Sequence, residues 1–264
     1  MVPVGVAVTL SLLGDLALFA SLPLNVDAVG LTVGSLGLVF GIHRLVRLGG
    51  NPLVGFLINQ RRRKPFFILG MTLAALSTLG YVLSNGLPLM IMSRVCWGIS
   101  WSLISLTSMA IVMDVSDESN RGRWVGMYYT FFLIGIATGS LVGGFLSDLI
   151  GFRMALVVCT VFTVVGGLQA LIFLPETLPI VEDQRRYQST QKAVVGQGVK
   201  GFFNTISSIK GLPVLLLIYM GKQFAGEGVL LSTLAILLQE RFVGGVTLVG
   251  IVIGVASLNG ALLA

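Results

Sequence analysis

Charged residues are scarce in this sequence of 264 residues: Asp, Glu, Lys and Arg make up 11% of it, whereas soluble domains average about 25%. Apolar residues make up 55%. A soluble globule of this composition would lack the polar side chains that cover a surface, and a disordered chain would contain far fewer apolar residues. The composition therefore excludes both classes and indicates a polytopic membrane protein.

The residues and motifs that catalysis or metal binding would need are missing as well. The two cysteines, Cys96 and Cys159, lack C-x-x-C spacing, and His43 is the one histidine. The sequence contains no G-x-S-x-G, phosphate-binding Walker loop or H-E-x-x-H motif. We predict no enzymatic activity, no metal site and no cofactor. Without a nucleotide-binding loop, transport would be driven by an ion gradient or would be passive.

Long apolar runs dominate what is present. A membrane-spanning helix needs about 20 mostly apolar residues, and eight such runs occur. We predict spans at 3–23, 30–58, 66–85, 88–113, 125–147, 154–174, 212–237 and 246–264. The runs are too long and too continuously apolar for barrel strands. The predicted fold is an all-α, multi-pass bundle in the lipid bilayer.

The placement of Lys and Arg predicts the orientation of these spans. The loops after the second, fourth and sixth spans hold 11 basic residues, whereas the opposite loops hold only Arg153 and Arg241. Basic loops face the cytoplasm, so we expect the N-terminus there too, in the cell membrane. This topology explains the net charge of +6 and leaves no support for a nucleic-acid partner.

One long polar segment divides the chain. Residues 176–211 contain no run long enough to cross a membrane, and a stretch near 194–209 could form an amphipathic helix at the interface. We predict a six-helix bundle over 1–175, a cytoplasmic linker over 176–211, and the start of a second bundle over 212–264.

An internal repeat supports a transporter. Gly55-Phe-Leu-Ile-Asn59 recurs 89 residues later as Gly144-Phe-Leu-Ser-Asp148, at equivalent positions of two three-helix units. One copy falls at the cytoplasmic end of its span and the other at the external end. Inverted repeats of this kind are typical of secondary transporters.

The loop between spans 2 and 3 resembles a motif of the major facilitator superfamily, G-x-L-a-D-R-x-G-R-K. Gly55, Leu57, Arg63 and Lys64 match it, whereas Asn59 stands where the family has an acid. Gln60 and Arg62 also depart from the pattern. In the family, this acid and these bases are thought to lock the two halves in one state.

Three further stretches resemble the same family. Arg94-Val-Cys-Trp97-Gly98 is similar to R-x-x-Q-G in span 4, and residues 175–177 read Pro-Glu-Thr at the close of span 6. Residues 135–144 are similar to the antiporter motif G-x-x-x-G-P-x-x-G-G, with Ser140 in place of proline. The resemblance implies a transporter of the drug/proton antiporter kind, with twelve spans in two bundles.

Glycines at helical spacing predict close helix contacts. In span 5, Gly135, Gly139 and Gly143 recur every four residues, and Gly144 completes the motif; in span 2 the stripe is Gly30, Gly34, Gly37 and Gly41. Small faces let helices approach closely in lipid. Each stripe could be static packing or a contact that slides as a cavity opens and closes.

Seven ionisable residues lie inside the apolar runs, where a charge costs about 2.5–3.5 kcal/mol on insertion scales. They are Asp15, His43, Arg44, Arg47, Arg94, Lys222 and Glu227. They must pair or face water. The arginines could form structural ion pairs with Asp15, or could bind a substrate anion or control a proton-carrying acid. Asp15 and Glu227 are the candidate proton sites, with Arg94 as a coupling partner, whereas we expect a hydrogen-bonded structural role for His43.

A second set of residues predicts the lining of a substrate cavity. Polar or aromatic side chains recur on one face of spans 2, 4 and 7. The candidates are Arg44, Arg47, Asn51, Trp97, Trp101, Tyr219 and Gln223.

These observations predict a secondary transporter that exports a small organic solute, coupled to protons, by alternating access. An uptake carrier, a uniporter and a non-transporting fragment remain the alternatives. Eight spans amount to one complete bundle plus two helices of the second, so we expect the chain to be truncated after its eighth span. We expect transport to need a further C-terminal segment or self-association rather than one chain alone.

Overall fold

The computed structural model describes residues 1–59, 62–177, 231–241 and 245–262, together with 211, 214–215, 218 and 221. Their long helices are α1 (Val2–Ser21), α2 (Leu36–Asn59), α3 (Arg63–Leu83), α4 (Leu87–Asp114), α5 (Arg121–Ile150), α6 (Phe152–Phe173), α10 (Leu231–Arg241) and α11 (Gly245–Leu262). Short 3-10 turns join α1 to α2. The prediction of an all-α bundle is confirmed.

Five segments in the described part of the chain are long and apolar enough to cross a membrane. They are Val2–Leu24, Arg63–Leu83, Leu87–Asp114, Arg121–Ile150 and Phe152–Phe173. They match the first, third, fourth, fifth and sixth predicted spans. The predicted seventh span lies mostly outside the described residues, and α10 continues to Arg241, past the expected end at 237.

The second predicted span begins too early. Helix α2 starts at Leu36 rather than at residue 30, because 3-10 turns occupy the connection and Gly30 ends one of them with a φ of 64°. Gly30 and Gly34 therefore do not lie on this helix. A Cβ atom at Gly37 or Gly41 would meet no atom within 4 Å. The expected glycine stripe on span 2 is wrong.

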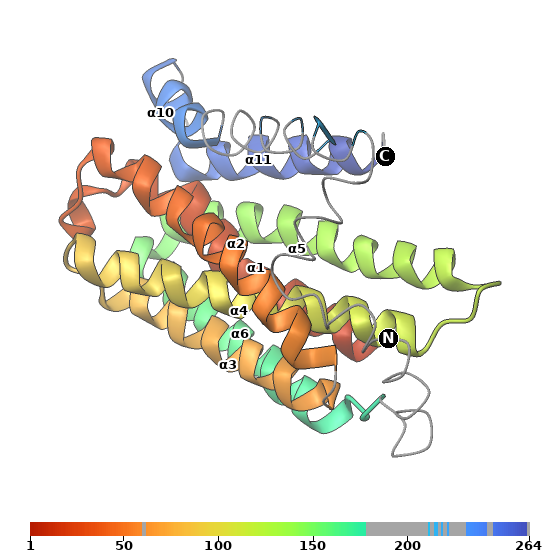
Figure 1. Ribbon diagram of the computed structural model, residues 1–264. Coiled ribbons are helices and arrows are strands. Elements are labelled where there is room, and N and C mark those ends of the chain that lie inside the picture. Colours follow the sequence, from red (N-terminus) through yellow and green to blue (C-terminus); the bar gives the residue numbers. More distant parts are fainter. Residues whose placement is uncertain are drawn as a thin grey trace.

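Helix α1 lies at the centre of the bundle (Figure 1). It packs against α5 and α6, while α3 packs against α4 and α6, and α2 against α4. Helix α5 packs against both α1 and α11, and α1 also touches α11 directly, so these two helices join the first six helices to the last one (Figure 1). Along α6, by contrast, the outward side exposes apolar side chains such as Val161, Leu168 and Ile172, which lipid can cover.

Arg153 is a basic residue on the side opposite the basic loops, and its contacts give it a structural role there. Its guanidinium donates to the carbonyl oxygens of Ala28 and Ser84 at 2.9 Å, to the carbonyl of Val82, and to Oδ1 of Asn85 at 2.6 Å. One side chain thus joins the α1–α2 connection, the α3–α4 connection and the start of α6. We call the bundle end that holds Arg153 the outer end.

The orientation of the bundle is testable by cysteine labelling after replacement of Cys96 and Cys159 by serine. Because the basic loop lies at the end opposite Arg153, an impermeant maleimide should label Arg62→Cys only from the cytoplasm and Asp27→Cys only from outside. Both positions are exposed. Labelling of both from the same side would contradict the fold, and exchanged sides would contradict the orientation.

Candidate functional site

A buried ion pair joins α1 to α4. Nη1 of Arg94 donates to Oδ1 of Asp15. The same nitrogen lies 3.3 Å from the hydroxyl of Tyr81, and Nε donates to the carbonyl oxygen of Val39 at 3.0 Å. The Arg94 side chain is fully buried. Breaking such a pair by removing one partner is costly, since it strands the other charge in a medium that cannot solvate it.

Three aromatic rings surround the guanidinium of Arg94. Its central carbon lies 5.0 Å from the ring centroid of Phe19, 5.6 Å from that of Phe40 and 5.8 Å from that of Tyr81. Each ring face attracts a cation, and the attraction strengthens where water is excluded. Helices α1, α2 and α3 thus hold the arginine in place even apart from its bond to Asp15.

Two cations of span 2 also lie near this pair, but Arg94 of α4 is the one that bonds to Asp15. Arg44 and Arg47 are half-buried on α2, and Arg44 lies within electrostatic reach of Asp15. His43 is buried, with its ring edge-on to Phe19 at 6.2 Å between centroids. Of the predicted pairings between Asp15 and the arginines, the ion pair that the structure contains is the one with Arg94.

The tryptophans of α4 follow the ion pair along the helix, toward the bundle end opposite Arg153. Trp97 and Trp101 stack with 5.8 Å between ring centroids, and Trp101 lies 5.7 Å from Phe132 of α5. Both tryptophans are buried, 2% and 8% exposed, in the core shared with α1. In this conformation they pack between helices, so lining of a cavity stays a prediction for them, as it does for half-buried Asn51 of α2.

Part of the predicted site lies outside the described residues. This holds for Glu227, Tyr219 and Gln223, and for the side chain of Asn59. The described half of the site consists of Asp15, Arg94 and their neighbours.

The glycine face of α5 is a close helix contact. A Cβ atom at Gly139 would lie 3.1 Å from the carbonyl oxygen of Leu12, and one at Gly143 would overlap the backbone of Ala17. Gly135 meets Thr9 of α1 in the same way. Gly144 instead faces α11, where a Cβ atom would lie 2.7 Å from the carbonyl oxygen of Val246. The motif therefore serves two helix contacts.

Replacing Gly143 with valine should destabilise the protein by about 1–3 kcal/mol, because the added side chain must displace the backbone of α1. The matched control is Gly126→Val on the same helix, where a Cβ atom meets nothing within 4 Å. Melting temperature in detergent measures the difference. Equal melting temperatures for the two variants would show that the α1–α5 contact yields without cost.

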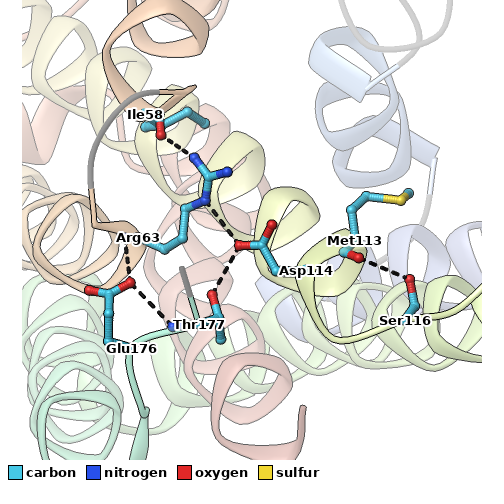
Figure 2. A network of polar contacts seen from close by, with 7 residues as sticks. All are labelled: Ile58, Arg63, Met113, Asp114, Ser116, Glu176 and Thr177. Atoms are coloured by element: carbon cyan, nitrogen blue, oxygen red, sulfur yellow. Dashed lines mark hydrogen bonds and ion pairs between the residues drawn. The ribbon is translucent and has the colours of Figure 1, made fainter. Parts of the chain in front are cut away.

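A polar cluster fastens the end of the bundle opposite Arg153 (Figure 2). Nε of Arg63 lies 3.1 Å from Oδ2 of Asp114, and Nη1 donates to the carbonyl oxygen of Ile58. Oε1 of Glu176 accepts from the backbone N–H of Arg63 at 2.7 Å, which caps the start of α3. Thr177 donates to Asp114 at 3.1 Å. The cluster ties the ends of α2, α4 and α6 to the start of α3.

This cluster explains two motifs together. Arg63 belongs to the loop motif and Glu176 to Pro-Glu-Thr, which lie 113 residues apart. Asp114 was not among the predicted residues, although its place at the end of an apolar run is visible in the sequence. Lys64 is half-buried beside the cluster, and Gly55 has open space where a Cβ atom would stand.

Long apolar helices, a buried ion pair and close glycine contacts are features of a polytopic helical membrane protein. A family model for the Major Facilitator Superfamily matches residues 4–264. The chain therefore belongs to the Major Facilitator Superfamily.

Known proteins agree with this assignment. Over 191 residues the chain is 23% identical to the tetracycline resistance protein, class B, of Escherichia coli, which covers 72% of the chain and 45% of that protein. It is 26% identical over 164 residues to multidrug resistance protein 2 of Bacillus subtilis, covering 62% of the chain and 40% of that protein. The chain matches less than half the length of these relatives.

Solved structures share the fold. A D-xylose-proton symporter superposes with a TM-score of 0.73 at 14% identity, covering 99% of this chain and 66% of that one. The human organic anion transporter MFSD10 superposes with a TM-score of 0.70 at 22% identity, covering 98% of this chain and 69% of that one.

Proposed function

We propose that the protein is a secondary transporter that exports a small organic solute across the cell membrane in exchange for protons. The observation that carries the proposal is the buried pair of Asp15 and Arg94. These are the described residues that place a carboxylate and a fixed cation together inside the membrane-spanning bundle.

The pair offers a chemical switch. Asp15 bonds to Arg94 as a carboxylate, and a proton on Asp15 removes the charge that this bond needs. Arg94 would then keep its contacts with Val39, Tyr81 and the aromatic rings, while the charged bond between α1 and α4 would be lost. Because proton binding and ion pairing exclude one another, movement of the helices can be coupled to proton flux.

The proposed direction of transport and the proposed class of substrate rest on the sequence motif and on the relatives. The span-5 glycine motif resembles that of antiporters, and the relatives named above include a tetracycline resistance protein and a multidrug resistance protein. These support export of an organic compound over uptake. The basic loops support a cytoplasmic N-terminus in the cell membrane.

Everted membrane vesicles provide the test. Vesicles from cells expressing the chain are given a respiration-driven pH gradient, which an acridine dye reports by quenching. Tetracycline, ethidium and fluorescein serve as probes of differing charge. We expect at least one probe to release the quenching relative to vector-only vesicles, because its exchange consumes the gradient. Two results together would overturn proton-coupled export: no probe changes the quenching, and every probe moves across the membrane independently of the pH gradient.

A further inference from the structure

The apolar runs of this chain carry more positive than negative charge. Of the seven ionisable residues inside them, four are Arg or Lys and two are acids, Asp15 and Glu227. The excess of positive charge is the same whichever acid each cation faces. Because a charge at this depth is costly without a counter-charge, an anion that binds among these cations is stabilised there.

Arg44 and Arg47 place two of these cations side by side on α2. Residues three apart are neighbours on a helix surface, and both arginines lie within electrostatic reach of buried His43, as does Arg94 of α4. Arg94 is fully buried in its ion pair with Asp15, whereas Arg44 and Arg47 are only half-buried. A solute can therefore reach the guanidinium groups of Arg44 and Arg47.

A row of aromatic rings on α5 and α4 begins near Arg47. Tyr128 of α5 lies within electrostatic reach of Arg47. Its ring is edge-on to that of Tyr129, with 5.5 Å between centroids, and Tyr129 is edge-on to Phe132 at 6.2 Å. Phe132 in turn contacts Trp101 of α4. Tyr129 is 48% exposed, so the row offers ring surface to a flat apolar body as well as packing between helices.

We propose that the transported solute is an organic anion with a flat apolar body, whose negatively charged group binds Arg44 and Arg47 while the rings of α4 and α5 contact its body. A planar guanidinium donates two parallel hydrogen bonds to a carboxylate, sulfonate or phosphate group. The same positive charges repel an organic cation, so the site selects by charge. The inference rests on the proposed function for the transport step, and it adds the class of the substrate and the residues that recognise its charge.

Two dyes with the same fused-ring core but opposite charge test this site. Fluorescein is an anion in slightly basic buffer, and rhodamine 123 is a cation. Their binding to the purified full chain in dodecyl maltoside is followed by fluorescence anisotropy, with protein-free micelles as the blank. We expect fluorescein to bind at least tenfold more tightly than rhodamine 123, because the two dyes differ mainly in the sign of their charge.

Charge-matched variants locate the binding site. Arg44→Gln and Arg47→Gln should each weaken fluorescein binding at least fivefold, because each removes one guanidinium from the site. Arg123→Gln removes the same charge from an exposed position near the start of α5 and should leave the affinity unchanged. Arg47→Lys keeps the charge but loses the paired donors, so its affinity should lie between those of the parent and Arg47→Gln. Gel filtration selects folded preparations, and the Lys variant and the preference of the parent between the dyes decide the matter if a Gln variant does not fold.

The outcomes distinguish this inference from the proposed function. Fluorescein binding that is absent, or no tighter than that of rhodamine 123, would overturn the anion site. An equal loss of affinity in Arg44→Gln, Arg47→Gln and Arg123→Gln would also overturn it, because general attraction to a positively charged chain would explain the binding. Gradient-driven exchange of ethidium but not of fluorescein in the vesicle test would support export and contradict selection for anions. Fluorescein that binds through Arg44 and Arg47 but does not change the quenching would support the site and contradict proton-coupled export of this anion.

Discussion

Arg94→Ala should destabilise the folded protein by about 3–5 kcal/mol, the usual cost of removing one partner of a buried ion pair. The substitution leaves the carboxylate of Asp15 in the bundle interior without its cation, and it also removes a guanidinium that contacts three aromatic rings. Urea or thermal unfolding in detergent, followed by tryptophan fluorescence, measures the loss.

A double-mutant cycle provides the control for this prediction. In Asp15→Asn/Arg94→Ala neither charge of the pair remains, so we expect part of the stability lost in Arg94→Ala to return. The gain relative to the single variants measures the coupling between the two residues. Additive effects of the two substitutions would show that Asp15 and Arg94 do not act as a pair.

Asp15→Asn should abolish gradient-driven transport, reducing flux at least tenfold, while the protein still folds. The amide keeps the shape of the side chain and one oxygen that accepts from Arg94, but it cannot take up and release a proton. The rings of Phe19, Phe40 and Tyr81 still hold the cation in place. Flux is measured in everted vesicles, with folded yield from gel filtration alongside.

The matched control for Asp15→Asn is Asp27→Asn, which removes an exposed carboxylate outside the bundle interior. It should leave both flux and yield unchanged. If Asp15→Asn instead lowers folded yield and the folded fraction transports normally, then Asp15 is a structural partner of Arg94 and does not carry the proton.

Much of the fold could be predicted because it depends on local composition. An apolar run of about 20 residues is a spanning helix wherever it packs, so α1 and α3 to α6 matched their predicted ranges closely. The start of α2 did not, because the turn at Gly30 lies inside an apolar stretch and hydropathy does not distinguish a 3-10 turn from a helix. A positive φ is a property of backbone conformation, which the residue type permits but does not require.

Of the candidate site, only the ionisable residues could be predicted from the sequence. The insertion cost of a charge singles out Asp15 and Arg94 among seven ionisable residues, and requires that each of them pair or face water. It does not say that Arg94, rather than Arg44 or Arg47, is the partner, because that depends on how α1, α2 and α4 pack. Phe19, Phe40 and Tyr81 carried no signal, since an aromatic residue in an apolar run is expected whatever it contacts.

The roles of Arg153 and Asp148 illustrate the same limit. Arg153 looked like an exception to the basic-loop rule, and only the fold shows that it joins two connections to the start of α6. Asp148 was visible as the end of a repeated pentapeptide, but its contact with α11 lies 98 residues away. Long-range contacts of this kind follow from tertiary packing and have no periodicity to detect.

Flux from purified protein tests the central claim, proton-coupled transport through the Asp15–Arg94 pair, most directly. The chain and its Asp15→Asn variant are reconstituted in proteoliposomes with an imposed pH gradient, using a probe that responds in vesicles, and the mass of each species is measured in detergent. The account predicts gradient-driven flux from the parent and none from the variant. Equal gradient-driven flux from parent and variant would contradict it.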